Sequence, residues 1–426
     1  MPNKIKVLHL NASSGGGAFV VAQRLSEALN QTAEIESKHL VFTGKPGNYI
    51  LWADNFWRKK FAFFLHALEK LDFLRFEKNK SVRFAFSHGK TGINIAQNKY
   101  VKEADIIHLH WINKGFISLS GLENVLKLGK PMVWTCHDQW PFTGGCYYSG
   151  DCNHYLQGCG NCPMLKNPAE KDLSKRTFQR KKNSINKYNN LHFISPTRWL
   201  ADIGEASHMA IEKVIHVVPN CIDANLFFPE NRNEIRDRSG ISKKKYVILF
   251  AAVNIADKRK GFNEFTETMR ILATEKPNTF EVVFVGENKH EIAESEGYSQ
   301  RFTGYIADSK IMADWYKTAD LYVTTSNDDN LPTTIMESMA CGTPVAAFSV
   351  GGIPEMVENG ETGVLVDVYD SEGLAAGILK LMRLNSIEIE KMQENCRNKV
   401  LRDYANDIVT KKHIEFYKNI FVSKQY

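Results

Sequence analysis

The segment that most constrains the fold of this 426-residue chain is a short apolar strand followed by a helix that a proline opens. Residues 319–325 (ADLYVTT) predict a buried parallel strand, Pro332 suits a first helical turn, and Gly342 ends the helix about three turns later. A helix that starts just after a strand directs free backbone N–H groups at one point, which favours an anion there. Asp329 and Glu337 bracket that point, so each carboxylate could hold hydroxyl groups on one side of a phosphate. The pattern predicts a nucleotide-sugar site, with a capped core helix and two solvated acids as the alternative.

Strand, turn and helix follow one another in both halves of the chain. In the first half, Ile5–Leu10 predicts a strand that enters a turn and then a helix. Gly15, Gly16 and Gly17 in that turn would let backbone N–H groups approach an anion closely. The other strands predicted from apolar runs are 105–109, 132–136, 191–195, 246–253, 281–286, 301–304 and 345–348. This alternation is typical of doubly wound α/β domains with parallel sheets, and the chain is long enough for two of them.

The composition excludes several classes of protein. The net charge of +6, from 54 basic and 48 acidic residues, is too small to indicate a nucleic-acid partner. Apolar runs are far shorter than the roughly 20 residues that span a bilayer, and Ile5–Leu10 leads into the glycine turn without a signal-peptide cleavage site. We therefore expect a cytoplasmic protein whose eight cysteines are reduced or metal-bound rather than paired.

The segment from Asp329 to Glu337, with the following ESMACGTPVAAF, resembles the Glu-x7-Glu signature of family 4 retaining glycosyltransferases. An aspartate stands here in place of the first glutamate. The resemblance implies the GT-B fold, an α/β architecture of two facing Rossmann-like doubly wound domains with an interdomain cleft. It places an acceptor-side domain at 1–205 and a nucleotide-sugar-binding domain at 206–404. A last helix at 405–426 would cross back onto the first domain.

Three consecutive cations, Lys258, Arg259 and Lys260, follow the first strand of the second half. Lysine as a point charge and arginine as a fork could clamp a diphosphate there, and a solvated basic turn is the alternative. The family that this chain resembles has an arginine and a lysine six residues apart at this place. Lys260 matches the lysine, Asn254 stands at the arginine's position, and Arg259 is the nearest substitute.

The same resemblance implies further donor contacts. Glu337 corresponds to the carboxylate that binds the ribose, and Asp329 to the one that faces the sugar. His137, in the segment VWTCHD, corresponds to a histidine that faces the donor and would donate to a sugar hydroxyl or to the leaving phosphate. A buried structural histidine is the alternative, and His108 and His110 could line the same cleft. The remaining contacts implied are Tyr305 and Ile306 at the base and Asn330, Leu331, Pro332 and Thr333 at the helix start.

The family is a retaining one without a positioned protein nucleophile, so the resemblance implies substitution on the same face of the sugar. Negative charge builds on the departing diphosphate, and Lys260, Arg259 and the helix start at 331–334 would stabilise it. The leaving phosphate itself could deprotonate the acceptor hydroxyl. Because these cations come from the protein, we expect no metal cofactor for catalysis, with a nucleoside-diphosphate sugar as the donor substrate.

Four of the cysteines, Cys146, Cys152, Cys159 and Cys162, have the spacing C-x5-C-x6-C-x2-C, with His154 among them. A Cys-x2-Cys pair suits zinc, and four thiolates could close a tetrahedral structural site. Free thiols and disulfides are the alternatives, and the first gap is longer than zinc sites usually have. The run TCHDQWPFTGGCYYSGDC…GCGNCPML resembles certain bacterial polysaccharide glycosyltransferases.

Residues 56–76 (FWRKKFAFFLHALEKLDFLRF) predict an amphipathic helix rich in aromatic and basic side chains. Residues 56–90 hold nine Lys or Arg against three Asp or Glu. Such a helix can lie in the inner membrane surface, attracted by anionic lipid, or pack on the sheet with a solvated basic rim. A lipid-linked acceptor would favour the membrane interpretation and a peripheral location.

Together these patterns predict a retaining, hexosyltransferase-type enzyme that transfers a sugar from a nucleotide sugar to a glycan or lipid-linked acceptor. The expected context is bacterial surface polysaccharide biosynthesis. A sugar-nucleotide epimerase of the same fold is one alternative, although an epimerase should offer acid and base carboxylates in the cleft and this chain offers one pair. A nucleotide-sugar-binding protein without turnover is another, because Asp329 and Asn254 depart from the family pattern.

Overall fold

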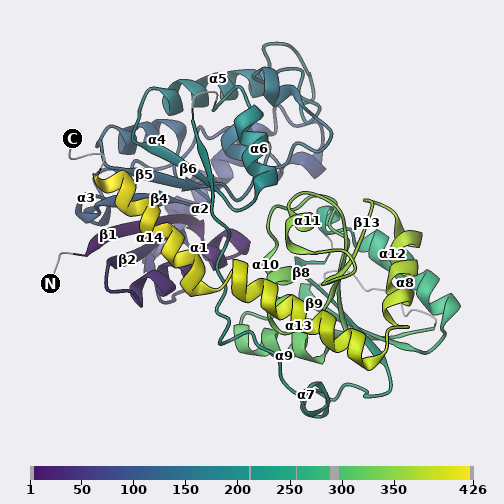
Figure 1. Ribbon diagram of the computed structural model, residues 1–426. Helices are drawn as coiled ribbons and strands as arrows, with labels where there is room; N and C mark the ends of the chain where they lie inside the picture. Colours follow the sequence, from purple (N-terminus) through teal and green to yellow (C-terminus); the bar gives the residue numbers. More distant parts are fainter. Residues whose placement is uncertain (1–3, 211–212, 256, 288–296, 423–426) are drawn as a thin grey trace. The chain divides into compact units, whose positions relative to one another are not determined.

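The computed structural model describes residues 4–210, 213–255, 257–287 and 297–422. The chain forms two compact units, Met1–Pro219 with Val409–Tyr426, and Asn220–Ile408 (Figure 1). Each unit contains one parallel sheet with helices on both faces, which confirms the predicted doubly wound α/β class. The end of the predicted last helix, 423–426, lies outside the described residues.

The sheet of the first unit has the strand order β3-β2-β1-β4-β5-β6-β7. Its strands are β1 (Ile5–Ser13), β2 (Ile35–Thr43), β3 (Ile50–Leu51), β4 (Ile106–Leu109), β5 (Met132–Thr135), β6 (Leu191–Ser195) and β7 (Ile215–Val217). The helices of this unit are α1 (Gly17–Asn30), α2 (Phe56–Phe73), α3 (Lys99–Glu103), α4 (Leu119–Leu126), α5 (Leu173–Asn186), α6 (Arg198–Ala206) and most of α14 (Asn406–Val422). The sequence predicted β1, β4, β5 and β6, and it missed β2, β3 and β7.

The sheet of the second unit has the order β10-β9-β8-β11-β12-β13. Its strands are β8 (Tyr246–Asn254), β9 (Phe280–Glu287), β10 (Ser299–Gly304), β11 (Leu321–Thr324), β12 (Val345–Phe348) and β13 (Gly363–Val366). Its helices are α7 (Arg232–Ser239), α8 (Phe262–Glu275), α9 (Ser309–Thr318), α10 (Thr333–Ala340), α11 (Ile353–Met356), α12 (Ser371–Leu381) and α13 (Ser386–Asp403). Five of the six strands were predicted, and β13 was missed because its four residues follow a turn without a distinct apolar run.

The first segment of the first unit ends later in the chain than the expected domain bounds. The structure divides the chain after Pro219, whereas the expected boundary at 205 and 206 falls at the end of α6. The difference arises from β7, which pairs in parallel with β6 through Phe193 and Ile215 and so adds a seventh strand to the first sheet. With only three residues and one buried side chain, β7 carries too short a pattern to be recognised.

The two faces of the first sheet differ in chemistry because side chains alternate along each strand. On one face, Leu8 and Leu10 of β1 join a continuous apolar core with residues of β4, β5 and β6. On the other face, His9 of β1 lies beside His39 of β2 and His108 of β4 in the strand register. Helices α1 and α14 cover this histidine face, since α1 contacts His39 through Gln23 and α14 contacts His108 through Tyr417.

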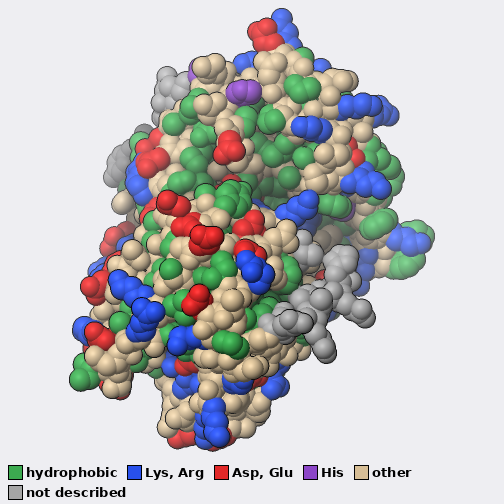
Figure 2. Space-filling model, turned by 90° about the vertical axis from the view of Figure 1, so that its right-hand side faces the viewer, with side chains coloured by type: hydrophobic (Ala, Val, Ile, Leu, Met, Phe, Trp, Pro, Cys, Tyr) green, Lys and Arg blue, Asp and Glu red, His purple; other side chains and the backbone are tan. Residues whose placement is uncertain are grey.

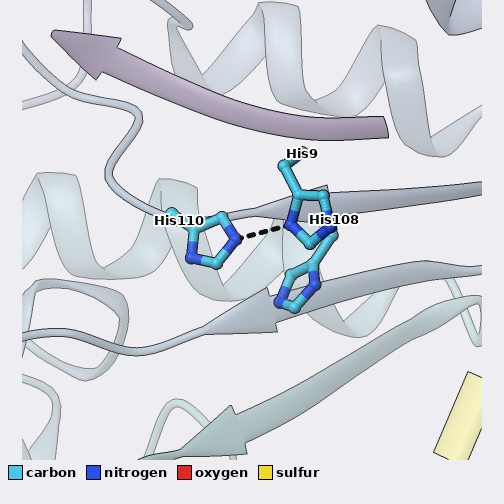
Figure 3. Close-up of side chains that lie close together, drawn as sticks. All are labelled: His9, His108 and His110. Atoms are coloured by element: carbon cyan, nitrogen blue, oxygen red, sulfur yellow. Dashed lines mark hydrogen bonds between the residues drawn. The ribbon is translucent and has the colours of Figure 1, made fainter. Parts of the chain in front are cut away.

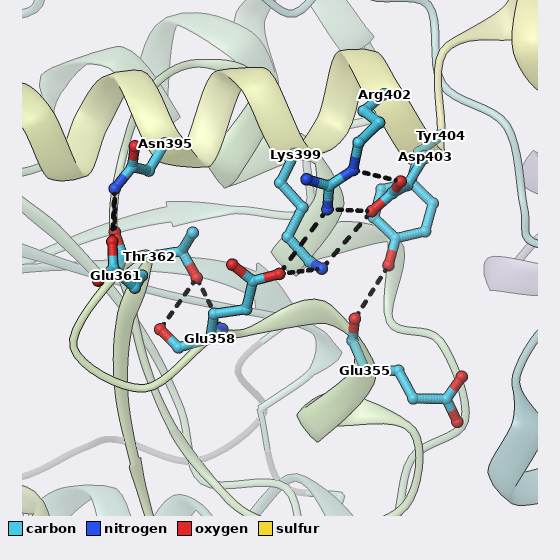
Figure 4. A network of polar contacts seen from close by, with 9 residues as sticks. All are labelled: Glu355, Glu358, Glu361, Thr362, Asn395, Lys399, Arg402, Asp403 and Tyr404. Carbon is cyan, nitrogen blue, oxygen red and sulfur yellow. Dashed lines mark hydrogen bonds and ion pairs between the residues drawn. The ribbon is translucent and has the colours of Figure 1, made fainter.

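The second unit has an apolar core on each face of its sheet. Helices α9, α10 and α13 cover one face, and α8 and α12 cover the other. Figure 4 shows how α13 is fixed to the segment before β13. Lys399 contacts the carboxylates of Glu358 at 2.8 Å and Asp403 at 3.5 Å, and Asn395 donates to Glu361 at 2.9 Å.

Among the described residues, no helix combines the length and apolar character that a membrane span requires. Acidic and basic side chains are both scattered over the face that Figure 2 shows, in keeping with the small net charge.

The hydroxyl group of Tyr417 is expected to stabilise the docking of α14. It lies 2.6 Å from His108 Nδ1, and both side chains are fully buried. Substitution Tyr417→Phe leaves His108 Nδ1 without this partner, so it should lower the free energy of unfolding by about 1–3 kcal/mol in denaturant titrations. The exposed Tyr369→Phe is the matched control and should change it by less than about 0.5 kcal/mol. Equal effects of the two variants would contradict this role.

Candidate active site

Polar segments meet at the carboxyl end of the second sheet, where β8 and β11 are neighbours. The basic turn Lys258–Lys260 follows β8, and residues 326–332 connect β11 to α10. Gly261 joins the two segments, because its backbone has a φ of +66° and a Cβ there would lie 1.8 Å from the carbonyl oxygen of Thr325. The Thr325 hydroxyl in turn donates to the Gly261 carbonyl at 2.6 Å. Only glycine fits such a close approach of two backbones.

An ion cluster around the buried carboxylate of Asp329 links the basic turn to the acidic segment. Lys260 Nζ donates to Asp329 Oδ2 at 2.5 Å, and Arg259 Nη1 lies 3.7 Å from the same oxygen. Arg259 Nη1 also donates to the carbonyl of Asp328 at 2.9 Å. Asp329 is 8% exposed. Burial is the largest influence on its carboxyl and raises the pKa, but Lys260 and Arg259 outweigh it and hold the pKa below its usual range, so Asp329 is a carboxylate at neutral pH.

The backbone of Asp329 is also fixed. Gly352 N–H donates to its carbonyl oxygen at 3.1 Å, and Asn330 N–H donates to its side-chain Oδ1 at 3.1 Å. Gly351 has a φ of +61°, and a Cβ at that position would lie 1.8 Å from the Asp329 carbonyl oxygen. The charge and the direction of this carboxylate are therefore set by segments that come from β8, β11 and the end of β12.

Helix α10 starts beside this cluster. Pro332 is the residue before the first helical turn rather than a member of it, because its ψ of 120° is extended, and its carbonyl accepts from Ile335 N–H. The helix ends at Ala340, and Gly342 follows with a φ of +73°. The N–H groups of the first helical turn have no partner within a helix, and they add to the positive end of the helix dipole. The cations and the helix start thus favour an anion at the same end of the sheet.

Glu337 lies further along α10 and is buried. The hydroxyl of Tyr316, from α9, donates to its Oε2 at 2.9 Å. Burial, and then the nearby Glu337 carboxylate, raise the pKa of Tyr316 well above its ordinary value, so Tyr316 stays a hydroxyl donor. This hydrogen bond fixes the orientation of the carboxylate that the sequence predicted to hold a ribose.

The other predicted donor contacts of the second unit are at the ends of strands. Asn254 is the last residue of β8 and is exposed. Tyr305 follows β10 and is 53% exposed, whereas Ile306 packs against the apolar core beneath α9 and α10. In the first unit, Gly16 has a φ of +86° and precedes α1, with open space beside Gly15, Gly16 and Gly17.

His137 of the first unit belongs to a chain of imidazole rings. Its Nε2 lies 3.0 Å from His110 Nδ1. Figure 3 shows the next contact of the chain, in which His110 Nε2 lies 2.9 Å from His9 Nδ1. His108 stacks on His110 and has its own partners, the hydroxyl groups of Tyr417 at 2.6 Å and Thr135 at 2.7 Å. Burial lowers the pKa of His137 to about 4, so this side chain is a neutral hydrogen-bonding group at physiological pH and adds no positive charge.

Three of these rings lie close enough together to suggest a metal site. Ligand nitrogens of His9, His108 and His110 lie within 4.8 Å of one another. The hydrogen bonds just described already occupy both nitrogens of His108 and of His110. A metal ion would have to break these buried hydrogen bonds, so the arrangement is that of a hydrogen-bonded chain within the core.

Several residues of these two sites carry no recognisable signal in the sequence. Tyr316 reaches Glu337 only because α9 packs against α10, and Gly351 reaches Asp329 only because the turn after β12 folds back. His9 and Tyr417 become partners of the predicted histidines through strand register and the docking of α14. Asp328 could have been noticed from its place beside Asp329.

Part of this chain is similar in sequence to known glycosyltransferases. Residues 231–400 match a family model described as glycosyl transferases group 1. The D-inositol 3-phosphate glycosyltransferase of Thermobispora bispora is 31% identical over 192 residues, 42% of this chain and 44% of that protein. The N-acetyl-alpha-D-glucosaminyl L-malate synthase of Bacillus anthracis is 22% identical over 213 residues, 49% of this chain and 54% of that protein. The chain thus spans about half of the length of these curated relatives.

Solved structures show the same fold over almost the whole chain. Sucrose-phosphate synthase from Thermosynechococcus elongatus has a TM-score of 0.66 at 16% identity, covering 99% of this chain and 100% of its own. Anabaena HepE in complex with UDP-glucose has a TM-score of 0.64 at 15% identity, covering 97% of this chain and 100% of its own. At these identities the likeness shows the fold, which is GT-B.

The carboxyl group of Asp328 is expected to make stability depend on pH. Its Oδ1 is buried without a hydrogen-bond partner among the described residues, and burial raises its pKa from 3.8 to about 7 despite the nearby Arg259. Because the folded state then holds the proton more tightly than the unfolded state, stability should fall as pH rises from about 4 to about 7. Asp328→Asn stays neutral, so its melting temperature should equal that of the parent near pH 4 and exceed it by several degrees at pH 8.

The control for this prediction is Asp367→Asn, at an exposed aspartate of the same unit. This variant should show no such pH-dependent difference in melting temperature. A constant difference between Asp328→Asn and the parent protein across pH 4–8 would show that folding does not raise the pKa of Asp328.

Proposed function

We propose that the protein is a retaining glycosyltransferase, and the match of residues 231–400 to the family model of glycosyl transferases group 1 supports this proposal. It transfers a sugar from a nucleoside-diphosphate sugar to a glycan or lipid-linked acceptor in bacterial surface polysaccharide biosynthesis. The observation that carries this proposal is the cluster of Lys260, Arg259 and Asp329 beside the start of α10.

The cluster suits the binding of a diphosphate. The Lys260 side chain is 23% exposed, so its ammonium group can be reached from solvent while Asp329 holds it on the other side. Arg259 is held beside Lys260, because its Nη1 donates to the Asp328 carbonyl and its Nη2 lies 3.6 Å from Asp257 Oδ2. From this place its guanidinium could form a fork with phosphate oxygens. The α10 start adds backbone N–H groups and the positive end of a dipole.

These groups would act mainly on the departing diphosphate. As the bond between the sugar and the phosphate breaks, negative charge grows on the phosphate oxygens, and preorganised cations stabilise that charge more than they stabilise the bound donor. The leaving phosphate can then take the proton of the acceptor hydroxyl, which attacks the same face of the sugar. In this scheme the protein supplies the positive charge, and the transfer step requires no metal ion.

The remaining donor contacts follow from the same placement. Glu337, oriented by Tyr316, would accept hydrogen bonds from the ribose hydroxyls, and Asp329 would face the sugar. Asn330, Leu331, Pro332 and Thr333 would surround the phosphates, with Tyr305 and Ile306 at the base. The UDP-glucose bound in Anabaena HepE, a structure of the same fold, supports a nucleotide sugar as the donor. Asn254 would contact the donor at the end of β8. In the first unit, Gly15–Gly17 would approach a ligand at the start of α1, and His137 would donate a hydrogen bond as a neutral imidazole.

Donor turnover tests the proposal. Incubation with UDP-, GDP- and dTDP-sugars should release nucleoside diphosphate for one of them, measured by mass spectrometry. Lys260→Ala should lower kcat by about 10²–10³-fold, because it removes one electrostatic stabiliser of the leaving group. Glu337→Ala should chiefly raise KM for the donor. Lys391→Ala, at an exposed lysine of α13, is the control and should leave both constants unchanged.

The same assay separates the alternative functions. Conversion of the donor to an epimer, with no nucleoside diphosphate released, would indicate an epimerase. Tight donor binding without any product, for every acceptor tried, would indicate a binding protein and would agree with the departures at Asp329 and Asn254. An anomeric proton coupling that differs between donor and product would contradict retention.

Helix α2 supports the membrane-surface part of the proposal. Its inner side is buried through Ala62, Leu65 and Phe73. Its outer side, which we call the aromatic face, also carries large apolar side chains: Phe56, Trp57, Phe61, Phe63, Phe64, Leu68 and Leu71. Trp57 is 77% exposed and Phe63 is 73% exposed. An apolar face of this extent on a surface helix marks an interaction site rather than a solvated rim.

Basic side chains surround the aromatic face. Lys59, Lys60, Arg75 and Lys78 are exposed along and just after α2, and Lys60 Nζ lies 4.5 Å from the Phe56 ring centroid. Anionic lipid complements this charge, with a gain of about 1 kcal/mol for each cation near the surface. We propose that the aromatic face enters the headgroup region of an anionic membrane, where a lipid-linked acceptor would be presented.

Vesicle sedimentation tests this contact. The protein should bind vesicles that contain phosphatidylglycerol and bind phosphatidylcholine vesicles weakly. Replacing Trp57, Phe63 and Phe64 together by serine should abolish binding, and Lys59→Gln with Lys60→Gln should weaken it about 30-fold and reduce its salt dependence. Ile387→Ser, at an exposed apolar residue of α13, is the control. Self-association that the serine variant removes, without vesicle binding, would instead assign the face to a second copy of the chain.

A further inference from the structure

The four cysteines of the first unit that lie between β5 and α5 converge on one small cavity. Cys146, Cys152, Cys159 and Cys162 all line it, together with His154 and Tyr155. Its volume is about 20 Å³, which is room for roughly one particle of the size of a water molecule. All four thiols are free, and none of the other four cysteines of the chain lines this cavity.

Hydrogen-bond donors already surround the sulfur atoms. Gly144 N–H donates to Cys159 Sγ at 3.1 Å. Cys162 Sγ accepts from Met164 N–H, and the Thr143 hydroxyl fixes the backbone at Cys146 by donating to the carbonyl of that residue at 2.6 Å. Donors of this kind orient metal ligands and stabilise thiolates in structural metal sites.

The turn that presents Cys159 and Cys162 is held in an unusual conformation. Four successive residues have positive φ angles: Gly158 at 88°, Cys159 at 62°, Gly160 at 107° and Asn161 at 49°. For a cysteine and an asparagine this conformation costs about 1–2 kcal/mol each, so the surroundings must impose it.

Groups outside the turn impose this conformation. Asp172 accepts from Cys162 N–H at 2.8 Å, and the Ser174 hydroxyl accepts from Gly160 N–H at 3.0 Å. His154 Nδ1 lies 2.9 Å from the Gly160 carbonyl. The turn is thus built so that both sulfur atoms reach the cavity.

A buried cation lies next to the same loop. Lys181 of α5 is fully buried, donates to the carbonyls of Thr143 and Trp140, and interacts electrostatically with Cys146 and Cys159. Within the described part of the chain, no carboxylate forms an ion pair with Lys181. These two carbonyls and the nearby Asp138 carboxylate already stabilise its positive charge, and an anionic centre in the neighbouring cavity would add to them.

We propose that Cys146, Cys152, Cys159 and Cys162 bind one zinc ion as a structural site. Four thiolates around Zn²⁺ carry a net charge of −2, which is opposite in sign to the ammonium group of Lys181 beside the cavity. His154 then holds the turn through Gly160 rather than binding the metal. The site goes beyond the proposed transferase activity, because its role is to fix the loop that follows β5 and His137.

Zinc would also draw the four sulfur atoms together. Zn–S bonds of about 2.3 Å in a tetrahedron place sulfur atoms about 3.8 Å apart. Among the described residues, His9, His108 and His110 are the only set of three whose ligand atoms lie within 4.8 Å of one another, so the sulfur atoms are more widely spaced than this. Binding of zinc by all four cysteines would therefore require sulfur atoms to move closer together.

The metal content of the full-length protein tests this proposal directly. Protein purified under reducing conditions from zinc-supplemented culture should contain about one zinc ion per chain by plasma mass spectrometry. Removal by a strong chelator should lower the melting temperature, and added zinc should restore it. Substitution by cobalt(II) should give the visible spectrum of a tetrahedral tetrathiolate site.

Variants assign the ligands. Cys159→Ser with Cys162→Ser should abolish zinc binding, whereas Cys136→Ala, at a buried cysteine of the same unit outside the cavity, should retain it. If the double variant does not fold, the zinc content and the cobalt spectrum of the unaltered protein still decide the matter. Protein without zinc whose four thiols react freely, or whose mass shows disulfides, would overturn the proposal. Neither result bears on donor turnover, which is measured separately.

Discussion

The buried carboxylate of Asp329 constrains the second unit more than any other group. An isolated charge in a protein interior costs several kcal/mol, so it must be paired and hydrogen-bonded to remain ionised. Lys260 and Arg259 provide the opposite charge from the turn after β8, and Asn330 provides a backbone donor. The pairing is possible only because Gly261 and Gly351 allow backbones to approach closely. One ion cluster therefore fixes the relative positions of three loops at the carboxyl end of the sheet.

The first unit also stabilises buried polar groups, but it does so without ion pairs. Its sheet also buries polar groups, on β1 and at the end of β4, but these are the imidazoles of His9, His108 and His110, which burial keeps neutral. Neutral rings need hydrogen bonds rather than counter-ions, and they find them in one another and in Thr135 and Tyr417. The first sheet thus carries a neutral polar cluster, and the second sheet carries an ionic one.

The sequence contained enough information to predict the fold class and the proximity of Lys260 to Asp329. Both residues follow strands of one parallel sheet, and the carboxyl ends of such strands meet at one edge, so their approach requires no knowledge of packing. Strand β2 was missed because Glu36, Ser37, Lys38 and His39 interrupt its apolar pattern, although it is buried over most of its length. The contact between Tyr316 and Glu337 could not be predicted, since it depends on how α9 and α10 pack.

The return of α14 to the first unit has a consequence for synthesis on the ribosome. Domains at the beginning of a chain generally fold while later residues are still being translated. Here the histidine face of the first sheet is covered by His413 and Tyr417, which follow the whole of the second unit in the sequence. The unit that emerges first is therefore completed last. Until α14 has been translated, His108 lacks the contacts that His413 and Tyr417 provide in the folded protein.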